Sequence, residues 1–120
     1  MSIIASVLVA LIALFHAYVL VLEMFLWEGP RGRALSGYDP EMARATATLA
    51  ANQGLYNGFL AAGLAWGLWE SDPTGYRVRV FFLCCVVVAG VYGGLTANRR
   101  ILFVQALPGA LALAAVVAAG

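Results

Sequence analysis

The first apolar run of the chain, residues 3–27, constrains the fold more than any other feature, because only His16 and Glu23 interrupt it. A helix needs about 20 apolar residues to cross the hydrocarbon core of a bilayer. The run has no basic segment before it and no small-residue cleavage site before the charged loop, which distinguishes it from a secretory signal peptide. We therefore predict a retained transmembrane helix over these residues.

Three further apolar segments follow, and each is bounded by residues that end or begin helices. Gly29 and Pro30 end the first helix, and Asp39-Pro40-Glu41 is typical of a helix start, with Asp39 as the N-cap. Residues 70–75 have the composition of a turn. Pro108 is expected to kink the last helix. The predicted helices cover about residues 3–27, 40–69, 77–97 and 100–119.

Composition indicates that lipid is the main solvent. The 120 residues are 63% hydrophobic and only 11% charged, whereas about a quarter of the residues in soluble domains are charged. A chain this short buries too little surface to hide so much apolar area from water. We therefore predict an all-α integral membrane protein: a single transmembrane domain over residues 1–120, built as a four-transmembrane-helix bundle, with the lipid bilayer as its main partner. The net charge of +1 gives no sign of a nucleic-acid partner.

The arginines predict an orientation in the membrane. With four spans, both termini lie on one side, and the first and third connections lie on the other. Those two connections hold five of the seven basic residues, and the rest of the chain holds two, Arg77 and Arg79. The positive-inside rule then places both termini outside the cytoplasm, in a multi-pass protein of the cell inner membrane. The five arginines expected in the cytoplasm are Arg31, Arg33, Arg44, Arg99 and Arg100.

Glycines four residues apart recur in the second and third predicted helices. Small residues at this spacing let helix backbones approach closely in lipid, where no hydrophobic force drives helices together. We therefore expect these two helices to be central to the bundle, with Gly58 and Gly90 in helix–helix contacts. The pairs are Gly54 with Gly58, Gly63 with Gly67, and Gly90 with Gly94.

Polar side chains within the predicted helices define a candidate site. Facing lipid is costly for such groups, so they are expected to point into the bundle. Four of them form one stripe on the second helix, and His16 and Glu23 lie two turns apart on one face of the first. At about 1.5 Å per residue, most lie in the cytoplasmic half of the membrane. We predict one ligand-binding polar pocket lined by His16, Glu23, Asn52, Gln53, Tyr56, Asn57, Tyr92 and Gln105.

Simpler roles compete with this interpretation. Asn and Gln often hold membrane helices together, at about 0.6 to 2 kcal/mol each. His16 could be a neutral imidazole that Asn57 satisfies. Glu23 lies one turn from the first connection, where it could pair with Arg31, Arg33 or Arg99.

No cofactor or metal is predicted. One His and one Glu do not complete a catalytic zinc site, which usually has three protein ligands. Cys84 and Cys85 are adjacent within an apolar run and match no redox or zinc spacing. We interpret both cysteines as packing residues, with a metal-ion carrier that uses them as a remote alternative.

Two segments, LAANQGLYNGFLAAGL at residues 49–64 and ILFVQALP at residues 101–108, resemble a bacterial family of small four-helix integral membrane proteins of unknown function. Shorter matches extend the resemblance over nearly the whole chain. Gly109 departs from the pattern, because the family more often has Ala after the Pro. The resemblance implies a four-helix membrane protein and implies no activity. The shorter matches are EMFLW at 23–27, PRG at 30–32 and AGVYG at 89–93.

Together these patterns favour a protein that binds or transports a small molecule in a polar pocket within the cytoplasmic half of the bundle. One alternative is a small membrane enzyme that acts on a lipid-like substrate with His16 and Glu23 as acid and base. Another is a non-catalytic scaffold subunit. The candidate partners are a small-molecule or lipid ligand and a second copy of the chain.

Overall fold

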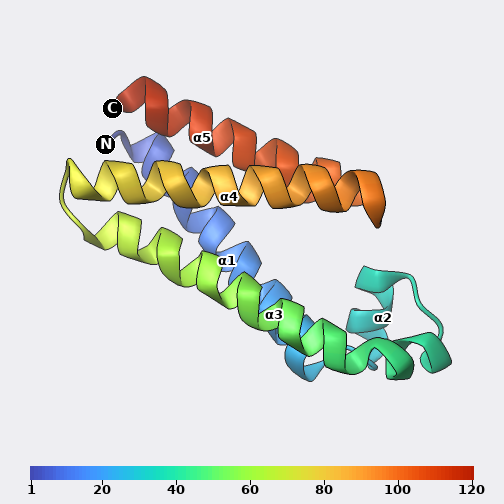
Figure 1. Cartoon of the computed structure of the whole chain (residues 1–120). Coiled ribbons are helices and arrows are strands. Elements are labelled where there is room, and N and C mark those ends of the chain that lie inside the picture. Colours follow the sequence, from blue (N-terminus) through green and yellow to red (C-terminus); the bar gives the residue numbers. More distant parts are fainter. The chain divides into compact units, whose positions relative to one another are not determined.

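The computed structural model describes all 120 residues. It contains five α-helices and one π-helical turn, and it has no strand (Figure 1). The prediction of an all-helical chain is confirmed. The chain forms two compact units, residues 14–61 and residues 1–13 with 62–120, and each is described by itself. The elements are α1 (Ile3–Phe25), α2 (Pro30–Ser36), α3 (Pro40–Trp69), α4 (Thr74–Thr96), the π turn η1 (Leu102–Ala106) and α5 (Leu107–Ala119).

Helix α2 is an element that the sequence did not predict, because it lies between the predicted helices 3–27 and 40–69. Pro30 stands in its first turn, where the missing N–H costs no hydrogen bond. It ends at Gly37, whose φ of 77° is a left-handed conformation that favours glycine. Its 7 residues are too few for an apolar periodicity to be recognised.

Trp27 ties the end of α1 to the rest of the unit that covers residues 14–61. Its indole Nε1 donates to Thr46 Oγ1 of α3 at 3.0 Å. Its ring packs edge-to-face on Tyr38, with centroids 6.1 Å apart. The predicted N-cap is also confirmed, because Asp39 Oδ1 accepts the Met42 N–H at 2.8 Å. α3 therefore begins at a fixed place beside the end of α1.

In the other unit, α4 packs along η1 and α5 (Figure 1). The two backbones approach closely at Gly90, where an added Cβ atom would lie 2.7 Å from the Ala106 backbone nitrogen. The prediction that Gly90 lies in a helix–helix contact is confirmed. Helix α4 begins at Thr74, three residues before the predicted start, with Pro73 at its N-cap.

The last helix opens with the π turn directly before Pro108. Leu107 donates its N–H to Leu102 O, five residues back. Pro108 has no N–H, and its ring crowds the preceding turn, so the wider π turn makes room for the ring; a kink at Pro108 stays a prediction. Within the turn, Gln105 Nε2 donates to Val86 O of α4 at 3.0 Å.

Arg79 fixes the turn between α3 and α4. Its guanidinium donates to Gly67 O through Nη1 at 2.7 Å and to Asp72 Oδ1 through Nη2 at 2.8 Å. The side chain is only 3% exposed. The Arg79 hydrogen bond also lowers the pKa of Asp72 below its ordinary value. Arg79 thus holds the end of α3 and the start of α4 together.

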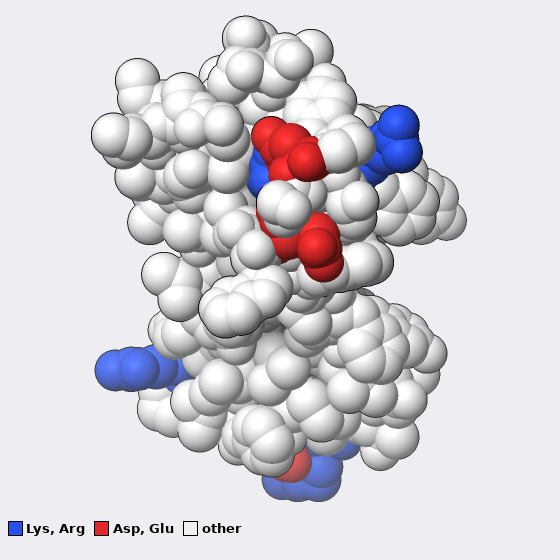
Figure 2. Space-filling model, turned by 90° about the vertical axis from the view of Figure 1, so that its left-hand side faces the viewer, with Lys and Arg blue, Asp and Glu red and all other residues white.

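Three helical segments are long and apolar enough to cross a membrane: α1, α4 and residues 102–119. Helix α3 has 30 residues but carries the polar stripe, and it is not among them. On the face shown in Figure 2, most of the surface carries no charged side chain. These features are consistent with a location in a membrane.

Candidate functional site

The candidate site centres on Glu23, near the end of α1. The residue is 4% exposed. Its Oε2 accepts a hydrogen bond from Gln53 Nε2 at 2.8 Å, and its Oε1 accepts one from Asn57 Nδ2 at 2.6 Å. Gln53 and Asn57 are four residues apart on α3 and share one face of that helix. One carboxyl group is therefore held by two amides of a neighbouring helix, and we call this group of three the carboxylate–amide cluster.

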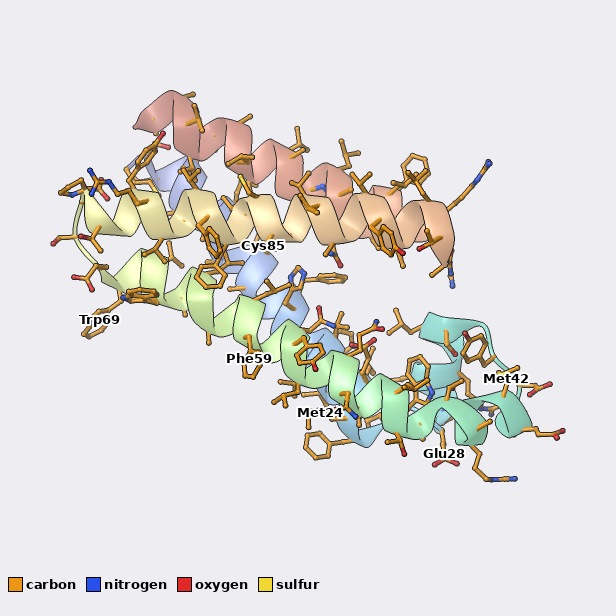
Figure 3. All side chains as sticks on the ribbon, viewed as in Figure 1. Met24, Glu28, Met42, Phe59, Trp69 and Cys85 are labelled. Atoms are coloured by element: carbon orange, nitrogen blue, oxygen red, sulfur yellow. The ribbon has the colours of Figure 1, made fainter.

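Two glycines of α3 bring the helices close enough for these bonds. Gly54 and Gly58 each follow an amide residue by one position. A Cβ on Gly54 would lie 2.8 Å from Met24 Cγ and 3.2 Å from the Leu20 carbonyl oxygen, and one on Gly58 would lie 2.5 Å from Leu20 Cδ1. The prediction that Gly58 lies in a helix–helix contact is confirmed. Figure 3 shows the labelled Met24 on α1 within this unit.

Glu23 is in no ion pair within the unit that covers residues 14–61. The ion pairs of the structure are Arg44 with Glu28, at 3.9 Å, and Arg79 with Asp72. Within this unit, no ion pair joins Glu23 to Arg31 or Arg33, and pairing with Arg99 of the other unit stays a prediction. Both carboxyl oxygens act as acceptors. The cluster thus combines a buried acid with neutral donors only.

Asn52 and Tyr56 do not join the cluster. Asn52 Nδ2 donates to Thr48 O within its own helix, at 2.9 Å. Tyr56 is 60% exposed, and its ring lies 6.1 Å from the ring of Phe59. Because a helix turns by about 100° per residue, these two side chains leave α3 on a different side from Gln53 and Asn57. The polar stripe therefore divides into one part bound to α1 and one exposed part.

His16 lies on α1, seven residues before Glu23, and is 1% exposed. Its ring contacts Phe15 edge-to-face, with centroids 5.5 Å apart. At about 1.5 Å per residue, the two α1 side chains start about 10 Å apart along the helix axis.

Tyr92 and Gln105 belong to the other unit. Tyr92 is 72% exposed on α4, and Gln105 is bonded to Val86 O. A single ligand site that uses all eight predicted residues stays a prediction.

Met24 is the site residue that the sequence analysis missed. It contacts Gly54, and it stands four residues after Leu20, which contacts Gly58. This repeated pairing of a long apolar residue with a glycine was a readable signal for the face of α1 that meets α3.

The chain contains no group of three or more His, Cys, Asp or Glu residues that could hold a metal ion. Cys84 and Cys85 are free thiols, one exposed and one half-buried. The side chains of the carboxylate–amide cluster are oxygen acceptors and amide donors. Its chemistry therefore lies in charge and hydrogen bonding.

Comparison with known proteins identifies the family. The family described as "Protein of unknown function (DUF1304)" matches residues 10–117. A bacterial relative from Lactococcus lactis subsp. lactis (strain IL1403), named "Uncharacterized protein YpaA", is 33% identical over 119 residues, which cover 98% of this chain and 97% of the relative. No solved structure matches the chain. The resemblance to a bacterial family of unknown function is confirmed, and this chain belongs to the DUF1304 family.

Proposed function

We propose that the protein crosses the membrane with four helices and binds or transports a small molecule at the carboxylate–amide cluster. In this arrangement α3 is the fourth span, both termini lie outside the cytoplasm, and the whole chain forms one transmembrane domain of the cell inner membrane. Three apolar helices support the proposal directly. Helix α3 is long enough, and the side-chain amides of Gln53 and Asn57 are bonded to Glu23 of α1.

The observation that carries the proposal is the buried Glu23 carboxyl group, which has two amide partners and no ion pair within residues 14–61. An ionisable residue within a membrane helix is expensive to keep and is a functional-site hypothesis by default. Placing it beside lipid or apolar neighbours would cost several kcal/mol, on the order expected for any unpaired charge. Amide hydrogen bonds reduce this cost but leave the charge in place. A ligand that completes the site explains why the charge is kept.

A second candidate function is a scaffold, in which the cluster only joins α1 to α3. The specific observation in its favour is that both Glu23 oxygens already accept a hydrogen bond. The two candidates differ in what a small molecule does to the cluster. A bound ligand perturbs the amides, whereas a purely packing cluster stays unchanged.

The test is a nuclear magnetic resonance titration of the full chain in lipid nanodiscs. The resonances to follow are the side-chain amides of Gln53 and Asn57, during titration with a library of neutral, anionic and cationic small molecules. The Asn52 side-chain amide is the matched control, because it bonds only within α3. We expect at least one compound to shift the cluster amides saturably and leave Asn52 unmoved. If no compound does so, ligand binding is rejected and the scaffold function stands.

A further inference from the structure

The charge of the carboxylate–amide cluster selects among classes of ligand. As a carboxylate, Glu23 contributes one negative charge, Gln53 and Asn57 are neutral, and no ion pair within residues 14–61 includes Glu23. An anionic ligand would add like charge to a buried carboxylate, which is costly where solvent screening is weak. A neutral ligand would leave the charge unbalanced. A cation is the class that neutralises the site.

The polar groups left over in the cluster are mainly acceptors, together with one N–H of the Gln53 amide. The amide nitrogens of Gln53 and Asn57 are used on Glu23, and Asn57 Nδ2 also contacts Gln53 O at 3.2 Å. Each amide retains a carbonyl oxygen, and each carboxyl oxygen retains a second lone pair. Such a set is matched by a ligand that carries several N–H donors, because a charge-assisted N–H···O bond is about twice as strong as a neutral one.

Two apolar side chains of α1 adjoin the cluster. Met24 and Leu20 flank it on α1, where they contact the two glycines of α3. Gln53 is exposed, so the cluster extends from the buried carboxylate to the surface of its unit. A ligand with a charged nitrogen head and an apolar body fits both kinds of neighbour.

We propose that the ligand of the Glu23 cluster is an organic cation with N–H donors, of the ammonium, amidinium or guanidinium type, attached to an apolar group. This inference rests on the proposed function, because it names the class of molecule bound at the same site. Glu23 supplies the charge, and Gln53 and Asn57 orient the carboxylate and supply further acceptors.

Charge-matched probes test the inference. Phenylguanidinium, phenylurea and benzoate present a similar ring with a positive, neutral or negative head. Each is titrated into the full chain in nanodiscs of zwitterionic lipid, with the Gln53 and Asn57 side-chain amides as the readout. We expect phenylguanidinium to bind at least tenfold more tightly than phenylurea, and benzoate to leave the amides unmoved.

Two variants test whether the preference for phenylguanidinium depends on the Glu23 carboxylate. Glu23→Gln keeps the side-chain length and an acceptor oxygen but removes the charge, and it should weaken phenylguanidinium binding at least tenfold. Glu28→Gln is the matched control, because Glu28 lies just beyond α1 and pairs with Arg44; it should bind within twofold of the wild type. If Glu23→Gln does not fold, Glu23→Asp replaces it and should retain the preference for phenylguanidinium over phenylurea.

Equal binding of phenylurea and phenylguanidinium would overturn the cation inference and leave the proposed function intact. The same holds if Glu23→Gln folds and binds phenylguanidinium as the wild type does. If none of the three probes shifts the Gln53 and Asn57 amide resonances, the cation inference is also contradicted. The proposed function then depends on the separate library titration, so the two failures are distinguishable.

Discussion

Asn57 on α3 donates an amide hydrogen to the Oε1 of Glu23 on α1 over 2.6 Å, and this is the shortest polar link between two helices in the unit that covers residues 14–61. The bond is charge-assisted, which accounts for its length. It places the carboxylate against the same face of α3 that carries Gly54 and Gly58.

Loss of this bond should destabilise the protein. Asn57→Ala leaves a buried carboxylate with one donor fewer, and we expect the free energy of unfolding to fall by about 1 to 3 kcal/mol, the range for hydrogen bonds to charged groups. Asn52→Ala is the matched control, since its side chain bonds only within α3, and it should change stability little. Unfolding by detergent titration measures both. Equal effects at the two positions would show that the bond to Glu23 adds nothing.

The close glycine contacts predict that larger residues at Gly90 and Gly58 destabilise the protein. Gly90→Ala pushes a methyl group against the Ala106 backbone, which cannot move aside as a side chain can, and Gly58→Leu displaces Leu20. We expect each to lower stability by about 1 to 3 kcal/mol through overpacking. Gly93→Ala is the control, because its added Cβ would lie 3.5 Å from Ile101 Cδ1, an ordinary contact. Melting temperatures in detergent that match the wild type for both Gly90→Ala and Gly58→Leu would contradict the close packing.

The Asp72–Arg79 pair predicts a pH dependence of stability. The Arg79 hydrogen bond lowers the pKa of Asp72 in the folded chain below its ordinary value of 3.8. The pair therefore stabilises the protein above that ordinary value, and its contribution is lost as the pH falls through the lower folded-state pKa. Asp72→Asn should lower the melting temperature near neutral pH and make little difference at pH values well below 3.8. A deficit of the variant that persists unchanged in acid would rule out the ionised pair as its cause.

The four-span arrangement predicts the side on which the chain ends. A reporter that is active only in the periplasm should be active when it is fused after residue 120, because the arginine-rich connections are expected in the cytoplasm. The companion fusion carries a reporter that is active only in the cytoplasm. Activity of that reporter at residue 120 would reverse the orientation and place the cluster in the opposite leaflet.

Most of the long helices could be predicted from the sequence, because the length of an apolar segment and the residues that end helices are strong signals. The spacing of Gln53 and Asn57 indicated one face of α3, but it did not distinguish that face from the one with Asn52 and Tyr56. The face of α3 that meets α1 is the one that carries Gly54 and Gly58, since small residues let the two helices approach closely. Helix α2 and the π turn left no periodic signal, because both are short and depend on Pro30, Pro108 and local packing.

The affinity of Glu23→Gln for the tightest ligand from the library titration tests most directly whether Glu23 serves binding rather than packing. Gln keeps one acceptor oxygen but loses one of the two amide bonds, so we expect the free energy of unfolding of Glu23→Gln to fall by about 1 to 3 kcal/mol, as for Asn57→Ala. In that same folded sample, the affinity should fall at least tenfold. An unchanged affinity together with a large loss of stability would contradict the binding role and show that the carboxylate serves only to hold α1 against α3.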